Sequence, residues 1–315
     1  MPAIRRAGPQ GAETMLQLAL AYQFQGRLDE ALDIVAQAQK ALGPPDKADP
    51  FLLGEVSANR AYVLYSQTDL KRGLAEANAA LDYYARANTP PPEAVAKLLS
   101  TKGLLLSDDQ QFDAAEAAMG QALAIYRRTL GDRNRATAQA WYALALNEQA
   151  AGKLAQAENS INHALAIDRV VLDNDNPMLA DAISGQGQIF QSEHKLDAAA
   201  AALNDAIATY HRAYGATNPQ IGITLVYLAL AESDRGHLAA ALKDLDEAKH
   251  NYDVGYGKLH PNHGDLLVNR ATILAKYGRR QEAIADCAAG IKILDQTLGA
   301  DAAFTKGDAD LCKKL

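Results

Sequence analysis

Cysteine is nearly absent from this sequence, and aromatic residues are scarce. The 315 residues include two cysteines, Cys287 and Cys312, and aromatic residues make up 6% of the chain. Two cysteines are too few for a disulfide framework, and these two are not spaced as metal ligands. We therefore expect Cys287 to be a buried, inert thiol, Cys312 to be the more reactive of the two, and the protein to reside in a reducing cytosol.

The sequence also lacks the features of a membrane protein or a nucleic-acid-binding protein. No stretch reaches the ~18 uninterrupted apolar residues that a membrane span requires, and the opening MPAIRRAGPQGAE has no apolar core like that of a signal peptide. The formal net charge of -7 opposes binding driven by counterion release, and Lys and Arg form no cluster with interleaved aromatics. These absences predict a cytoplasmic protein whose partners are neither membranes nor nucleic acids.

Small helix-forming residues dominate what is present. Apolar residues make up 49% of the chain, with alanine foremost among them, and runs of β-branched residues are scarce. Alanine has the highest intrinsic helix propensity, whereas strands favour β-branched and aromatic residues. The composition therefore predicts an all-α fold with enough apolar surface for a continuous core.

A period of 42 residues organises the sequence. Steps of 42 from Gly152 meet a small polar turn each time, at Gly26, Thr68, Gln110, Gly152, His194, Gly236 and Gly278. Five residues after each turn stands a small residue: Ala31, Gly73, Ala115, Ala157, Ala199, Ala241 and Ala283. Small residues at one helical position in every unit favour close helix packing. Seven repeats are therefore predicted over residues 12–299.

Each repeat is predicted to be a helix A of roughly 13 residues, a tight turn and a longer helix B. Asn176, Asn218 and His260 each stand immediately before a proline, a pattern typical of an N-cap followed by proline at the first helical position. Helix A should begin there. Glycines suited to left-handed ends of the preceding B helices are Gly131, Gly215, Gly257 and Gly299.

These columns resemble those of tetratricopeptide-repeat proteins. Residues 122–158 are similar to the 42-residue variety found in kinesin light chains and many bacterial proteins. The resemblance implies a right-handed superhelical solenoid of antiparallel helix pairs, in which stacked repeats bury a continuous core. We expect a disordered N-terminal leader at 1–11, one solenoid at 12–299, and a capping helix or tail at 300–315.

Three motifs could carry chemistry, and each has a plainer interpretation. Gly152-Lys153 lacks the preceding strand of a phosphate-binding loop. His260 and His263 could ligate a metal, but no further ligand is evident, and His260 occupies the capping column. Neither cysteine has a recurring His or acid beside it. We therefore expect no catalytic residue, no metal and no cofactor, and the chain is not predicted to be an enzyme.

In this family the A helices line a concave groove, so the resemblance implies that partner contacts lie there. The candidate peptide-binding residues are Asn59, Tyr62, Tyr65, Lys97, Tyr142, Gln149, Gln188, Tyr227 and Asn269. Tyrosines supply rigid amphipathic area, and Asn and Gln supply donors and acceptors. Among the inward positions Glu13, Glu55, Asp108, Asp181, Asp234 and Asp265 outnumber Lys97 and Lys276, which favours a neutral to basic peptide.

Two functions fit these observations. The first is a non-catalytic scaffold that binds a peptide or helix of a partner protein in the groove. The alternative is the sensory or recruiting module of a larger regulator or enzyme, whose effector domain would lie outside this chain. The sequence leaves the oligomeric state open.

Overall fold

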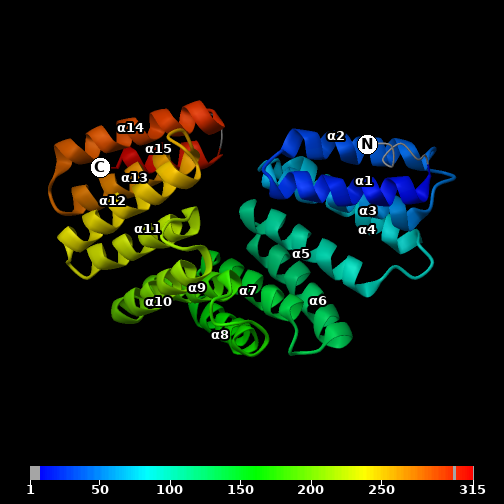
Figure 1. Cartoon of the computed structure of the whole chain (residues 1–315), viewed down its shortest axis with the longest axis horizontal. Coiled ribbons are helices and arrows are strands. Elements are labelled where there is room, and N and C mark those ends of the chain that lie inside the picture. Colours follow the sequence, from blue (N-terminus) through cyan, green and yellow to red (C-terminus); the bar gives the residue numbers. More distant parts are fainter. Residues whose placement is uncertain (1–7, 301–302, 315) are drawn as a thin grey trace. The chain divides into compact units, whose positions relative to one another are not determined.

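The computed structural model describes residues 8–300 and 303–314, and in this part of the chain there are fifteen helices and no strand (Figure 1). The A helices are α1 (Pro9–Phe24), α3 (Pro50–Ser66), α5 (Pro92–Asp108), α7 (Arg135–Ala150), α9 (Pro177–Ser192), α11 (Pro219–Asp234) and α13 (Pro261–Lys276). The B helices are α2 (Leu28–Leu42), α4 (Leu70–Arg86), α6 (Phe112–Leu130), α8 (Leu154–Val171), α10 (Leu196–Tyr214), α12 (Leu238–Gly255) and α14 (Arg280–Leu298). A last helix, α15, covers Ala303–Cys312. The all-α prediction is confirmed.

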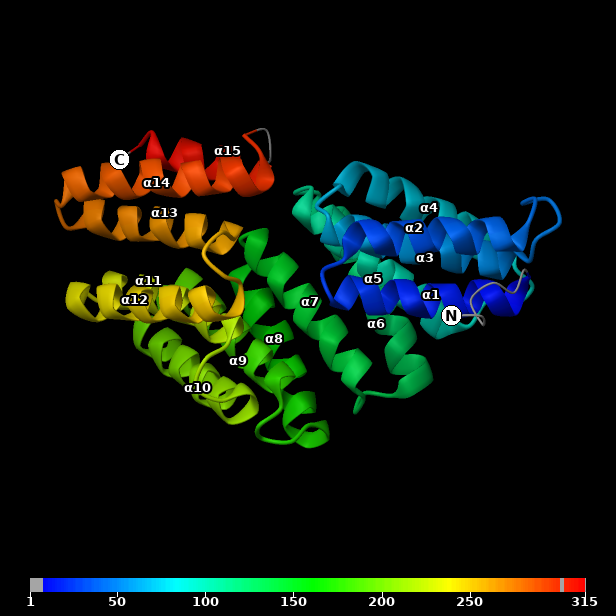
Figure 2. The same cartoon turned by 45° about the horizontal axis from the view of Figure 1, so that its top comes forward.

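The chain forms two compact units, unit 1 (Met1–Ser160) and unit 2 (Ile161–Leu315). Within unit 1, α3 packs against α4 of its own repeat and against the A helices α1 and α5 (Figure 2). Within unit 2, α13 packs in the same way against α14, α11 and α15. Both units therefore consist of stacked antiparallel helix pairs, and a single solenoid over 12–299 stays a prediction.

The A helices are longer than expected, with 16 or 17 residues each. The capping prediction explains where they begin. The side chains of Asn176 and Asn218 accept hydrogen bonds from the backbone N–H groups two residues on, at 2.9 and 2.8 Å. His260 does the same with Nδ1 at 3.3 Å, and each of the three is followed by proline. Helix A thus starts directly after the loop, because the cap satisfies a backbone donor that the first turn leaves free.

The predicted turn positions all have left-handed backbone conformations. Gly152 has φ 74°, and the non-glycine members Thr68, Gln110 and His194 have φ of 58°, 59° and 57°. A Cβ added at Gly152 would meet no atom within 4 Å, so the position is constrained by backbone conformation and not by space. Gly152 is therefore a turn residue, as predicted, since glycine adopts this conformation at little cost.

The predicted disordered leader at 1–11 overlaps the first helix. Helix α1 begins at Pro9, so residues 9–11 are helical, because Pro9 supplies a favourable first helical residue. Residues 1–7 lie outside the described part of the chain. At the other end, α15 packs on α13 and α14, the place that the A helix of a further repeat would take.

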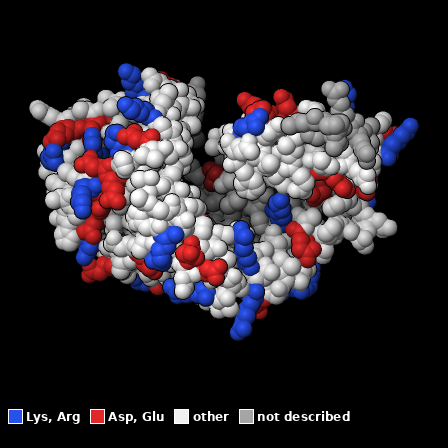
Figure 3. All heavy atoms as spheres, in the orientation of Figure 1, with Lys and Arg blue, Asp and Glu red and all other residues white. Residues whose placement is uncertain are grey.

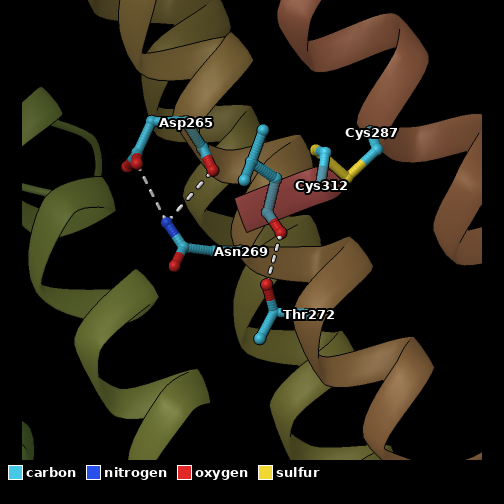
Figure 4. Close-up of a disulfide and its surroundings, with 6 residues drawn as sticks. Asp265, Asn269, Thr272, Cys287 and Cys312 are labelled. Carbon is cyan, nitrogen blue, oxygen red and sulfur yellow. Dashed lines mark hydrogen bonds between the residues drawn. A yellow bond between two sulfur atoms is a disulfide. The ribbon is translucent and has the colours of Figure 1, made fainter. Parts of the chain in front are cut away.

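Cys287 is buried, as predicted, but the prediction of two free thiols is wrong, because Cys287 of α14 and Cys312 of α15 form a disulfide (Figure 4). Their Cα atoms are 5.8 Å apart, although 25 residues separate them in sequence. Packing of α15 across α13 and α14 brings the two side chains together, which spacing along the chain does not reveal. Neither is a free, reactive thiol, and the prediction of a reducing cytosol loses this support, since disulfides persist mainly in oxidising compartments.

Candidate functional site

Three of the predicted site residues line one small hollow in unit 1, about 60 Å³ in volume, on the A-helix side. The lining residues are Leu20 of α1; Glu55, Ala58, Asn59 and Tyr62 of α3; Tyr84 of α4; and Ala94, Lys97, Leu98 and Thr101 of α5. Both polar and apolar residues line the hollow. Its size suits one or two side chains of a partner and is far below the ~300 Å³ or more of a cofactor pocket.

Asn59 provides an unused hydrogen-bond acceptor in this hollow. Its side chain is 9% exposed, and Nδ2 donates to the Glu55 backbone carbonyl at 2.8 Å. Oδ1 is buried and has no hydrogen-bond partner among the described residues. A buried acceptor left without a donor costs about 1–3 kcal/mol. Because Oδ1 is buried, an N–H group of a ligand would recover this free energy once the Asn59 amide turned towards the hollow.

Glu55 is oriented by a tyrosine that the sequence argument missed. The Tyr84 hydroxyl donates to the Glu55 carboxylate, and the Tyr84 side chain is 3% exposed. Gly54 makes room for the ring, because a Cβ there would lie 2.5 Å from it. Burial raises the pKa of Tyr84, so the hydroxyl keeps its proton and stays a donor. The carboxylate is thereby held at the edge of the hollow.

The same pair recurs three repeats later, where the Tyr210 hydroxyl donates to Asp181. Burial raises the pKa of Asp181, and the hydrogen bond from Tyr210 opposes that rise. The tyrosines Tyr84, Tyr126, Tyr210 and Tyr252 occupy one column of the 42-residue register. That column was the signal that could have identified Tyr84 from the sequence.

Tyr62 and Lys97 complete the hollow with an aromatic edge and a cation. Tyr62 is half-buried, and its backbone carbonyl accepts from Nε2 of Gln23 at 3.2 Å. The same nitrogen donates to Ser66 at 2.8 Å, so Gln23 ties α1 to α3 beside the hollow. Lys97 is exposed. The hollow therefore presents a fixed carboxylate and a solvated ammonium group.

The other unit 1 candidates lie outside this hollow. Tyr65 is half-buried on α3, and burial together with the charge of Asp108 raises the pKa of Tyr65 to about 12. Tyr142 and Gln149 are half-buried on α7. The structure does not bring these three residues together with Asn59.

In unit 2, the candidates Asn269 and Tyr227 both interact with Asp265, and Figure 4 shows the contact with Asn269. Asn269 donates through Nδ2 to the Asp265 carbonyl at 3.0 Å and to its carboxylate at 3.1 Å, so its amide donors are already in use. Burial and the charge of Asp308 on α15 raise the pKa of Asp265 to about 6. Burial and the Asp265 charge raise the pKa of Tyr227. Gln188 is half-buried on α9, and none of these contacts involves it.

The motifs considered for chemistry have structural roles. Lys153 Nζ lies 2.8 Å from Asp113 and 2.6 Å from Glu116, so two carboxylates of α6 neutralise the lysine of the suspected phosphate loop. His263 is buried, and its Nε2 lies 2.9 Å from the Gly257 carbonyl. His260 caps α13 and stacks on Tyr256.

Among the described residues, no group of three or more His, Cys, Asp or Glu side chains could hold a metal ion. No helix in residues 8–300 and 303–314 is long and apolar enough to cross a membrane.

Stacked antiparallel helix pairs with a left-handed turn inside each pair define an α-helical repeat protein. One model of the tetratricopeptide repeat matches residues 94–169 and 137–212, and another matches residues 12–38. The chain is a tetratricopeptide-repeat protein. No curated protein matches the sequence.

Solved structures share the fold at low sequence identity. A tetratricopeptide repeat protein from Parabacteroides merdae is 15% identical with a TM-score of 0.61, covering 97% of this chain and 100% of its own. The apo form of RapI is 12% identical with a TM-score of 0.66, covering 90% and 97%. A putative kinesin light chain repeat structure from Podosopora anserina is 17% identical with a TM-score of 0.54, covering 66% and 98%. These likenesses concern the fold, which generally serves as a non-catalytic scaffold for protein–protein interaction.

Proposed function

We propose that the chain binds a peptide or helix of a partner protein, and that the hollow formed by Glu55, Asn59, Tyr62 and Lys97 is part of the binding site. The observation that carries this proposal is the buried Asn59 Oδ1 without a donor, set beside a carboxylate that Tyr84 orients. Both groups accept hydrogen bonds, so the partner would insert an N–H group from its backbone or from a basic side chain. A neutral to basic peptide is therefore favoured.

The wider features of the chain support a protein partner. The net charge of -7 disfavours nucleic acid, and we propose no role for a membrane, a cofactor or catalysis. A Rap protein of similar fold was solved in complex with competence and sporulation factor; it is 14% identical, with a TM-score of 0.59. That structure supports ligand binding by a helical repeat array of this length.

The test begins with a displayed library of random peptides selected on the wild-type protein. Fluorescence anisotropy then compares the affinity of selected peptides for wild type, Asn59→Ala, Glu55→Gln and the triple variant Tyr62→Ala, Tyr142→Ala and Asn269→Ala. Loss of one buried hydrogen bond should weaken binding by about tenfold for Asn59→Ala.

The matched control is Gln156→Ala, an exposed amide on the B helix α8 and outside the hollow, which should leave affinity unchanged. Selected peptides whose affinity survives both Asn59→Ala and the triple variant would show that binding does not use these residues.

A further inference from the structure

A second concave surface lies on unit 1, between the B helices α4 and α6, with α5 as its floor. This α4–α6 groove has a volume of about 540 Å³. Leu74 and Leu81 of α4 form one wall, Leu99 and Leu106 of α5 line the floor, and Ala118 belongs to the α6 wall. The α5 residues that line the hollow, Lys97, Leu98 and Thr101, lie on a different face of that helix. The two surfaces are therefore separate.

Lys102 lies in the floor of the groove without a partner. Its side chain is half-buried among the leucines, and no hydrogen bond or ion pair joins it to any residue in the described part of the chain. Repeats related by the 42-residue register show which ion-pair partner Lys102 lacks. One repeat earlier the equivalent Arg60 pairs with Glu76 at 3.0 Å. Lys102 has Ala118 where Glu76 stands in that repeat.

Unit 2 contains the same groove with its charges paired. The groove between α12 and α14 has a volume of about 320 Å³, and its lining residues stand four repeats after those of the α4–α6 groove. There Arg270, the equivalent of Lys102, makes two hydrogen bonds of 2.7 Å to Asp286, the equivalent of Ala118. Figure 3 shows basic and acidic side chains intermixed over α12 to α14 on the face in view. The α4–α6 groove thus differs by being larger, less charged and left with an unmatched cation.

We propose that the α4–α6 groove docks an amphipathic helix of a partner protein, whose apolar side chains cover the leucines and whose acidic side chain pairs with Lys102. Leu74 and Leu81 lie seven residues apart on α4, about 10 Å at helical rise, which matches two turns of a docked helix. The alanines of α6 in the wall leave room for close approach. An acidic group would supply the partner that Glu76 and Asp286 supply elsewhere, in a site where apolar neighbours reduce screening by water.

The test uses a displayed library of helical peptides of about 15 residues, long enough to span the groove. Selection is made on the wild-type protein alone, and binding of the enriched peptides is then measured to Ala118→Asp, which would give Lys102 the internal partner that Arg270 has. Enriched peptides are expected to carry an Asp or Glu among apolar residues. Ala118→Asp should weaken their binding by about tenfold or more, since it removes the unpaired charge and fills part of the groove.

A second variant keeps the test independent of how Ala118→Asp folds. Lys102→Met keeps the apolar stem and removes the charge. Replacing the acidic residue of the peptide by its amide should therefore weaken binding to wild type by about tenfold but barely affect binding to Lys102→Met. Asp286→Ala, in the unit 2 groove, and Asn59→Ala, in the hollow, are the controls and should leave affinity for the groove unchanged. Failure to enrich any peptide on wild type, enriched peptides that lack an acid, or equal affinity for wild type and Ala118→Asp would each overturn the proposal.

Discussion

Reduction of the Cys287–Cys312 disulfide should release α15 and destabilise the C-terminal end of unit 2. The bond closes a loop of 25 residues. For a loop of that length, the chain-entropy relation for a cross-linked denatured state gives a stabilisation of about 3.5 kcal/mol at room temperature. Cys312 also packs beside Ala271 and Leu274, so the reduced helix keeps some apolar contact. We therefore expect α15 to open more often and not to detach permanently.

Hydrogen exchange measures this local opening directly, because α15 can unfold without the rest of the chain. In the oxidised protein the amides of α15 should exchange roughly 150- to 400-fold more slowly than in Cys312→Ser, the ratio that about 3 to 3.5 kcal/mol implies. Amides of α3 in unit 1 serve as the internal reference and should not change. Wild type with reductant should match Cys312→Ser.

Two results would refute the reasoning. Alkylation of both cysteines in the native, unreduced protein, detected by mass spectrometry, would show that the bond is not formed. Equal exchange rates in the oxidised and reduced proteins would show that it does not restrain α15.

Three further predictions concern single side chains. Asp265→Asn should raise the free energy of unfolding at pH 7 by about 1–3 kcal/mol. The pKa of Asp265 in the folded state is about 6, above the ordinary value of 3.8, so the folded state binds more protons than the unfolded state between these two pH values. Wild-type stability therefore falls as pH rises through that window. Urea titrations at pH 4 and 7 should show this fall in wild type and its loss in the variant, and an equal fall in both would contradict the assignment. Gly152→Ala should lower the free energy of unfolding, measured by thermal denaturation, by about 1 kcal/mol, since φ is 74° at this position. Gly152→Asn should lower it less, because Asn tolerates left-handed φ. Equal losses in the two variants would argue that the backbone conformation is not the cause. Tyr84→Phe should destabilise unit 1 by roughly 1–3 kcal/mol, because it removes the donor to the half-buried Glu55 carboxylate. In denaturation experiments, the double variant with Glu55→Gln should lose less unfolding free energy than the sum of the losses in the two single variants.

The helical repeat architecture could be predicted from local features of the chain. The period of 42 residues located the turn at Gly152, and the left-handed φ of Thr68 and His194 shows that the register holds even where glycine is absent. The caps Asn218 and His260 were also predicted, because capping depends on residues only two positions apart. These features follow from backbone preferences and helical periodicity, which operate over a few residues.

The candidate site was only partly accessible from the sequence. The register indicated that Asn59, Tyr62 and Lys97 lie on A-helix faces, and they do line one hollow. It did not indicate that Tyr84 holds Glu55, nor that the amide of Asn269 is occupied by Asp265. Side-chain hydrogen bonds depend on rotamers and burial, which sequence spacing does not specify.

Sequence periodicity alone was enough to specify the class of fold, because each repeat buries its apolar face only against a neighbour and so must recur in register. Tertiary packing determined the contacts between residues that are distant in the sequence. It placed Cys312 beside Cys287, and it left Lys102 opposite Ala118 in a groove where related repeats have ion pairs. Such pairings arise when separate helices pack side by side, and therefore only the three-dimensional structure shows which groups meet and which remain without a partner.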